Sequence, residues 1–98
     1  MEFISETMFK AALKQFRKDV PSVGTVSAIE VDQFLNEGRI CRGWTEEDGQ
    51  TKYFSIIKSP GSYPEKTVFS GRSEKELFQA IIQLGMEHGV DLKDLCSD

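Results

Sequence analysis

The middle of the chain contains an Asp48-Gly49 pair between two runs that favour extended backbone. Residues 39–45 and residues 52–58 are rich in β-branched and aromatic side chains, which are common in strands. Asp-Gly suits a tight turn between paired strands, because the central positions of that turn need positive φ angles. We therefore predict a β-hairpin over residues 39–58, which commits the chain to a fold with an antiparallel sheet.

A third strand is expected over residues 66–69, where the sequence reads Lys-Thr-Val-Phe. The segment before it, residues 59–64, contains two prolines and a glycine. Such residues do not fit inside a hydrogen-bonded ladder, so this segment is predicted to be a loop.

Amphipathic helices are predicted on both sides of these strands. Over residues 5–19, Ser5 is placed to cap the first turn and Pro21 ends the helix. Over residues 73–88, Ser73 and Glu76 form a capping-box pattern, and Gly89 suits the left-handed residue past the end. Apolar side chains recur at helical spacing in both segments, at Phe9, Ala12, Leu13 and Phe16, and at Leu77, Ile81 and Leu84.

Residues 26–37 fit two structures. Ser27 and Glu30 make a capping-box pattern, and Gly38 suits a helix end. Residues 29–32 alternate between apolar and acidic side chains, as a strand would. A short helix over residues 27–37 is the favoured interpretation.

These elements predict an α+β fold. We expect a small antiparallel β-meander of about three strands, with the N-terminal and the C-terminal helix packed on one face and the additional short helix at 27–37. A chain of 98 residues is large enough for one core. Residues 1–98 are therefore expected to form a single domain.

The composition indicates a packed protein in the cytoplasm. Hydrophobic residues make up 39% and charged residues 29% of the chain. No apolar run approaches the roughly 20 residues of a membrane helix, and the first six residues lack the basic start and apolar core of a signal peptide. Cys41 and Cys96 are too few for a secreted disulfide scaffold, so both are expected to be reduced thiols.

The residues that carry chemistry form no catalytic or metal-binding pattern. A structural zinc site needs four ligands with short paired spacings, whereas this chain has one histidine, His88, and two cysteines 55 positions apart. A cysteine nucleophile needs a lowered pKa and a positioned base. The chain also lacks a phosphate-binding Gly-x-x-x-x-Gly-Lys motif. We therefore predict a protein that is not an enzyme and that binds no metal or cofactor.

A non-catalytic protein-interaction module, accessory or regulatory, is the favoured function. Trp44, Tyr53 and Tyr63 are candidate contact residues, because Trp and Tyr are enriched at binding hot spots. Trp44 and Tyr53 could equally belong to the sheet core. Arg72 is a further candidate, since it precedes a helix N-terminus, where free N–H groups favour negative charge.

The first helix suggests an alternative function. Lys10, Lys14, Arg17 and Lys18 form a basic stripe that could contact phosphates or an acidic partner, although a solvated polar face is the favoured explanation, because every surface helix needs a polar side. The alternative is a nucleic-acid-binding protein, or an inhibitor of a nucleic-acid-acting enzyme. The net charge of −4 argues against nonspecific nucleic-acid binding. Residues 43–98 hold ten acidic and six basic groups, which account for the whole −4 and could mimic DNA.

A homodimer is also expected. A three-stranded meander with helices on one face leaves its edges unpaired. Its second face would expose some of the apolar side chains of Ile40, Trp44, Phe54 and Ile56. Symmetric pairing of two copies would bury that surface. If residues 26–37 instead form a fourth strand or a covering helix, the need for a dimer disappears.

Overall fold

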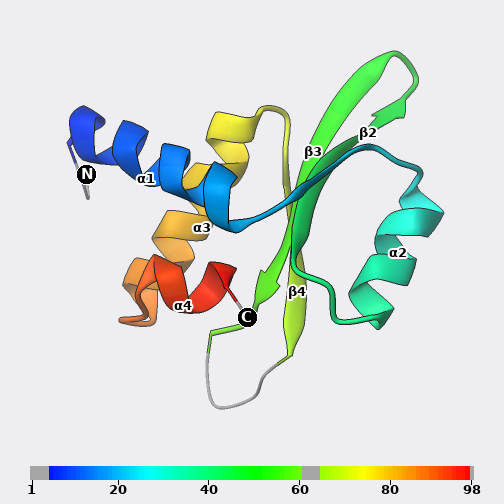
Figure 1. Cartoon of the computed structure of the whole chain (residues 1–98). Helices are drawn as coiled ribbons and strands as arrows, with labels where there is room; N and C mark the ends of the chain where they lie inside the picture. Colours follow the sequence, from blue (N-terminus) through cyan, green and yellow to red (C-terminus); the bar gives the residue numbers. More distant parts are fainter. Residues whose placement is uncertain (1–4, 61–64, 98) are drawn as a thin grey trace.

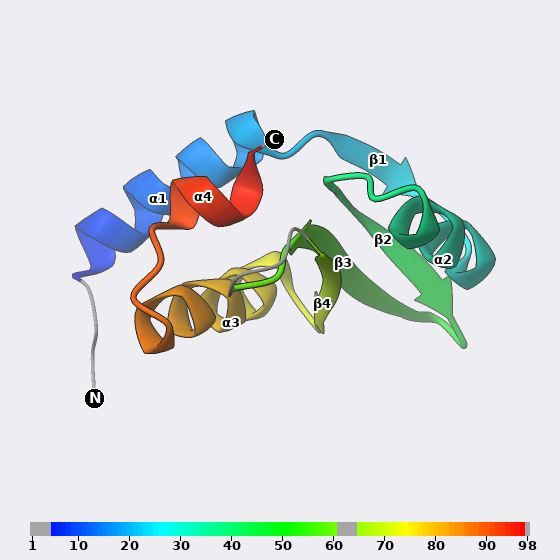
Figure 2. The ribbon, with the colours of Figure 1, turned by 90° about the horizontal axis from the view of Figure 1, so that it is seen from below.

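The computed structural model describes residues 5–60 and 65–97, and it contains a four-stranded sheet with helices on both faces (Figures 1 and 2). The strand order is β1-β2-β3-β4; β1 runs parallel to β2, and the other neighbours are antiparallel. The α+β prediction is confirmed. The elements are α1 (Glu6–Asp19), β1 (Ser22–Thr25), α2 (Ala28–Asn36), β2 (Cys41–Glu47), β3 (Gln50–Lys58), β4 (Lys66–Gly71), α3 (Glu74–Glu87) and α4 (Leu92–Cys96).

The predicted hairpin is confirmed as β2 and β3. The two strands pair continuously from Cys41 opposite Ile56 to Glu47 opposite Gln50. Asp48 and Gly49 form the turn with φ angles of 51° and 77°, the combination of positive values that a tight hairpin turn requires. The strands therefore run right up to the turn, so β3 begins two residues earlier than the sequence suggests.

The helices α1 and α3 begin where their caps predict. The hydroxyl of Ser5 accepts a hydrogen bond from the Met8 N–H at 3.2 Å, and that of Ser73 accepts one from the Glu76 N–H at 3.1 Å. Together with α4 they cover one face of the sheet (Figure 2). No helix within the described residues is both long enough and apolar enough to span a membrane. The buried side chains on this face are Phe16, Val20, Ile40, Ile57, Leu77, Phe78, Ile81, Leu95 and Cys96.

The helix α2 covers the opposite face (Figure 1). Its capping box is complete, because Ser27 and Glu30 each accept a hydrogen bond from the other's backbone N–H. Val31 of this helix packs on Cys41, Phe54 and Ile56. The helical interpretation of residues 27–37 is thus confirmed, and the expectation of an exposed apolar sheet face is wrong. The homodimer stays a prediction, but an exposed apolar sheet face no longer supports it.

The strand β1 was not predicted from the sequence. It is only four residues long, and Gly24 within it has a φ of 72°, which interrupts the pairing. In the sequence, the helix α2 lies between β1 and its partner strand β2, so the two strands are joined by a helical crossover. Gly43 of β2 permits the close approach, since a Cβ there would lie 2.6 Å from the Gly24 carbonyl oxygen. The sheet is therefore mixed, and its antiparallel meander is the part formed by β2, β3 and β4.

The side chain of Arg42 in β2 joins the sheet to two helices. Its Nε donates to the Val20 carbonyl at 2.9 Å, and its second terminal nitrogen donates to the Arg17 carbonyl at 3.2 Å, both at the end of α1. The remaining nitrogen lies 3.3 Å from the carboxylate of Glu74, the first residue of α3. The same carboxylate pairs with the side chain of Arg17. Arg42 therefore fixes where α1 ends and where α3 begins.

We expect Gly43→Ala to lower the free energy of unfolding by about 1–3 kcal/mol, as overpacking typically does. The new methyl group would meet the backbone of β1 at Gly24, so β1 must move away from β2. Urea denaturation measures the change, with Thr25→Ala, at an exposed position of β1, as a control expected to lie within about 0.5 kcal/mol of the original chain. If both variants unfold like the original chain, the close approach of the two strands is wrong.

We expect Arg42→Lys to lower the free energy of unfolding by about 1–3 kcal/mol. One ammonium group cannot reach both carbonyls and the carboxylate, and the Arg42 side chain is only 18% exposed. The matched comparison is Lys10→Met, which removes a surface ion pair whose side chains are 74% and 83% exposed and should cost about 0.5 kcal/mol or less. Thermal and urea unfolding report both values, and equal losses would contradict a special role for Arg42.

Candidate functional site

A groove lies between α2 and β4 on the face of the sheet that α2 covers. Its volume is about 230 Å³. Phe54 and Val68 of the sheet and Val31 of α2 give it apolar surface. We call it the α2–β4 groove, and it is lined by Ala28, Val31, Asp32, Thr45, Glu47, Lys52, Phe54, Val68 and Ser70.

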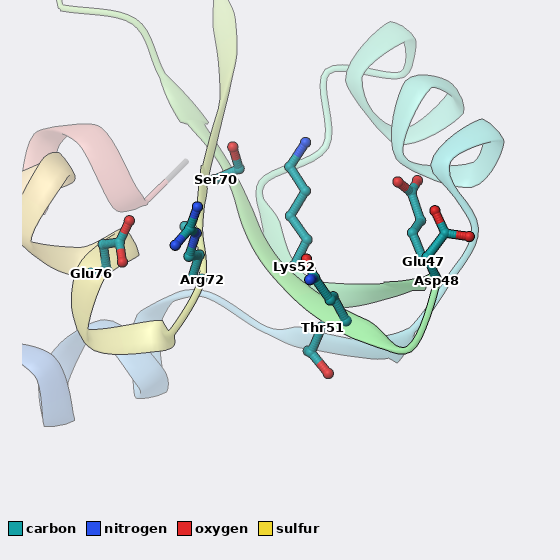
Figure 3. A pocket seen from close by; sticks show the side chains of 9 residues that line it. Glu47, Asp48, Thr51, Lys52, Ser70, Arg72 and Glu76 are labelled. Carbon is teal, nitrogen blue, oxygen red and sulfur yellow. The ribbon is translucent and has the colours of Figure 1, made fainter.

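A second, polar hollow continues from this groove at the end of the β2–β3 hairpin. Its volume is about 500 Å³, and it shares Glu47, Lys52 and Ser70 with the α2–β4 groove. Figure 3 shows Arg72 and Glu76 on one side of it, and Lys52 with Glu47 and Asp48 on the other. We call it the hairpin-end pocket, and it is lined by Glu47, Asp48, Gln50, Thr51, Lys52, Ser70, Gly71, Arg72 and Glu76.

The hairpin-end pocket exists because β3 is longer than β4 at this end. The last pair between the two strands is Tyr53 opposite Gly71, so residues 50–52 of β3 extend beyond β4. The chain turns into α3 directly after Gly71, where a Cβ would lie 2.8 Å from the Leu77 backbone nitrogen. The tight junction between β4 and α3 therefore leaves residues 50–52 of β3 paired with β2 but without a neighbouring strand on the β4 side.

The charges in the hairpin-end pocket are mixed, with an excess of carboxylates. Lys52 and Arg72 make no ion pair with any residue in the described part of the chain. Three carboxylates, those of Glu47, Asp48 and Glu76, line the same pocket. The adjoining groove adds Asp32. The site as a whole therefore favours a ligand with positive charge, while two cations remain able to bind carboxylates or carbonyl groups.

The aromatic candidates do not lie in this site. Trp44 and Tyr53 are neighbours across β2 and β3, with ring centroids 6.1 Å apart. Both are half-buried, and Tyr53 packs against the core under α1, α3 and α4, on the face away from α2. Tyr63 lies outside the described residues. Of the predicted contact residues that the structure describes, only Arg72 lines the hairpin-end pocket.

The basic stripe of α1 is partly neutralised by neighbouring carboxylates. Lys10 lies 3.4 Å from Glu6, and Arg17 pairs with Glu74. Lys14 and Lys18 are exposed and make no ion pair within the described residues. The structure therefore leaves two unpaired cations on this helix rather than four.

The two thiols are buried on opposite faces of the sheet. Burial raises the pKa of the Cys41 thiol; the nearby charge of Arg39 opposes this shift, and the charge of Glu37 contributes a smaller increase. Burial, with a smaller contribution from the charge of Asp19, raises the pKa of Cys96 to about 12. His88 is exposed and caps the end of α3. Among residues 5–60 and 65–97, no three His, Cys, Asp or Glu side chains lie close enough together to hold a metal ion.

A smaller hollow lies between α1 and α3. It has a volume of about 200 Å³ and an almost entirely apolar lining that includes Met8, Ile82 and Met86. Met8 is 60% and Met86 is 44% exposed. It offers no charged group to orient a ligand, whereas the α2–β4 groove combines apolar and charged surface.

Sequence reasoning missed most of the residues in the site. Lys52 and Val68 lie on strands that the sequence predicts and carry no functional expectation there, whereas the sequence places Ser70 in the segment that leads into the last helix. The structure extends β4 to Gly71, and alternation along this strand puts Val68 and Ser70 on the same face. Comparisons with protein families, with curated proteins and with solved structures find no match to this chain. The groove, its neighbouring pocket and their chemistry are therefore the basis for a functional proposal.

We expect both thiols to react slowly with an aromatic disulfide reagent at pH 8 in the folded protein and rapidly in guanidinium chloride. A pKa near 12 instead of 9.0 leaves Cys96 with a thiolate fraction lower by about a thousandfold. Gln79→Cys adds an exposed thiol on α3 as an internal standard that should react at the rate of a free thiol. Fast reaction of Cys41 or Cys96 in the folded chain would contradict their burial and would reopen a catalytic role.

Proposed function

We propose that this chain is a non-catalytic protein-interaction module, accessory or regulatory, that binds another protein through the α2–β4 groove. The observation that carries the proposal is an apolar groove beside an open strand edge, with unpaired charged groups at one end. This combination suits a peptide segment, because apolar surface supplies affinity and the charged groups supply orientation.

The apolar part of the groove has room for one side chain of moderate size. Val31, Phe54 and Val68 give the groove its apolar surface, and its volume is about 230 Å³. Burying a Val, Leu or Met side chain against such a surface contributes about 1.5–3 kcal/mol. The polar groups of Thr45, Lys52 and Ser70 surround it. One apolar anchor with polar contacts around it is typical of a moderate, reversible affinity.

The state of the thiols supports a role without catalysis, in the cytoplasm. Cys41 and Cys96 are both free, and both have pKa values raised by burial, which opposes use as nucleophiles. Two free thiols suit a reducing compartment. We therefore place the protein in the cytoplasm as part of the proposal.

Binding of nucleic acid receives less support. Only Lys14 and Lys18 of the basic stripe on α1 lack an ion pair within the described residues, and the chain has a net charge of −4. Strong binding to phosphates normally needs more neutralising cations than this. A protein partner with basic side chains fits the excess of carboxylates around the hairpin-end pocket better.

Panning a phage-displayed library of random linear peptides against the immobilised protein tests the proposal. We expect enriched peptides whose affinity falls by about tenfold or more with Ser70→Tyr, because a large side chain at this exposed position fills the groove. Thr25→Tyr, at an exposed position of the other edge strand, is the matched control and should bind like the original chain. An absence of enriched peptides, or equal binding to both variants, would overturn the groove as the binding surface.

A further inference from the structure

The direction of the backbone groups in β4 follows from the hairpin turn. A two-residue turn makes Glu47 and Gln50 a hydrogen-bonded pair, and the alternation along β3 then directs the N–H and C=O of Tyr53, Ser55 and Ile57 towards β4. The Ser59 N–H, next in this series, donates to the Glu65 carbonyl at 2.7 Å, which confirms that the odd-numbered residues of β3 direct their backbone groups towards β4.

On β4, the backbone groups that point away from β3 belong to every second residue. Thr67, Phe69 and Gly71 face Ile57, Ser55 and Tyr53, so their backbone groups are used inside the sheet. The N–H and C=O groups of Val68 and Ser70 therefore point away from β3. No residue within 5–60 or 65–97 pairs with them, because β4 is the last strand in the order.

The two edges of the sheet are not equivalent. At the other edge, Gly24 of β1 has a φ of 72°, its N–H is directed to the side chain of Ser22, and its pairing register is interrupted. A regular ladder cannot form on such a strand. β4 pairs with β3 without interruption over six residues. Among the described strands, β4 therefore offers the regular open edge, and it borders the α2–β4 groove through Val68 and Ser70.

The charge on α3 favours a foreign segment over a second copy at this edge. Phe78 of α3 contacts Phe9 and Phe16 of α1, so the opposite flank of α3 faces away from α1. Glu76 and Glu87 lie on that flank, eleven residues or about three turns apart, and Glu76 lines the hairpin-end pocket beside Ser70. A two-fold pairing of two β4 strands would bring these acidic flanks face to face. Like charges opposite each other disfavour that arrangement.

We propose that the partner binds as an extended segment that adds a fifth strand along the outer edge of β4. Its backbone would hydrogen-bond with Val68 and Ser70. Because side chains of a strand alternate between faces, one set would place an apolar residue in the α2–β4 groove and the other set would place Lys or Arg beside Glu76 and Glu87. This inference rests on the proposed function and specifies the partner as an extended segment with alternating apolar and basic residues.

The substitution Ser70→Pro tests the backbone contact directly. Proline removes the outward N–H of Ser70, is tolerated on an edge strand, and leaves the bonds of Phe69 and Gly71 to β3 in place. The matched control Ser70→Ala changes the side chain and keeps the N–H. We expect the library-derived peptides to bind Ser70→Pro about tenfold or more weakly than Ser70→Ala, which isolates the backbone N–H from the side chain. Equal affinity for the two variants would overturn strand addition while leaving groove binding, and hence the proposed function, intact.

Two measurements keep the inference testable if Ser70→Pro does not fold. Hydrogen exchange of the unmodified protein should slow at the amides of Val68 and Ser70 when a peptide binds. N-methylation of every second peptide residue should abolish binding when the methylated residues are those whose N–H groups point towards β4. It should leave binding unchanged when the other set of alternate residues is methylated. Unchanged exchange at both amides, or a peptide insensitive to N-methylation of either set, would overturn the inference.

A separate set of variants tests the contribution of the Glu76 and Glu87 charges to binding. The double variant Glu76→Gln and Glu87→Gln should weaken binding several-fold and reduce its salt dependence, whereas Asp94→Asn, at an exposed position of α4, should do neither. Enrichment of acidic peptides instead of basic ones would overturn the assigned side-chain pattern. Sedimentation equilibrium that shows a dimer disrupted by Ser70→Pro would overturn the foreign segment in favour of a second copy.

Discussion

The hydrogen bonds of Arg42 fix one corner of the molecule, and the shape of the proposed site follows from that corner. The guanidinium group holds the end of α1 through two carbonyl groups and the start of α3 through Glu74. Since α3 must begin there, β4 has to leave the sheet at Gly71. The hairpin of β2 and β3 continues beyond that point. The hairpin-end pocket is thus a consequence of where α3 starts.

On the other face of the sheet, the placement of α2 determines how much apolar surface stays exposed. By covering Cys41, Phe54 and Ile56 it removes the apolar surface that would otherwise favour a dimer. The cover is incomplete near β4, where the groove remains. Because β1 occupies the free side of β2, the regular open edge among the described strands lies at β4. Groove and edge therefore adjoin each other, which is the arrangement that binding of an extended peptide requires.

The site could be anticipated from the sequence only in fragments. Arg72 is a candidate from the sequence because it precedes a helix start, and it lines the hairpin-end pocket. Trp44 and Tyr53 are candidates from the sequence by residue type, yet their rings lie against each other on the face of the sheet away from α2. Lys52 carries no local signal of a site, because a lysine on a predicted strand is an ordinary surface residue, and Ser70 directly follows the predicted strand over residues 66–69. Their significance arises from the end of β4, which depends on contacts with residues far away in the sequence.

The local elements follow from residues that are close together in the sequence. Ser5, Ser27 and Ser73 start the three longer helices, and Asp48 with Gly49 sets the hairpin register, because capping and turn geometry depend on neighbours within a few residues. Long-range packing places α2 on the other face of the sheet, makes Ser22–Thr25 a strand and leaves the edge of β4 open among the described strands. The parallel pairing of β1 with β2 spans a crossover helix, and its stability comes from long-range packing such as that of Val23 on Gly43. A four-residue segment interrupted by glycine has no such preference on its own.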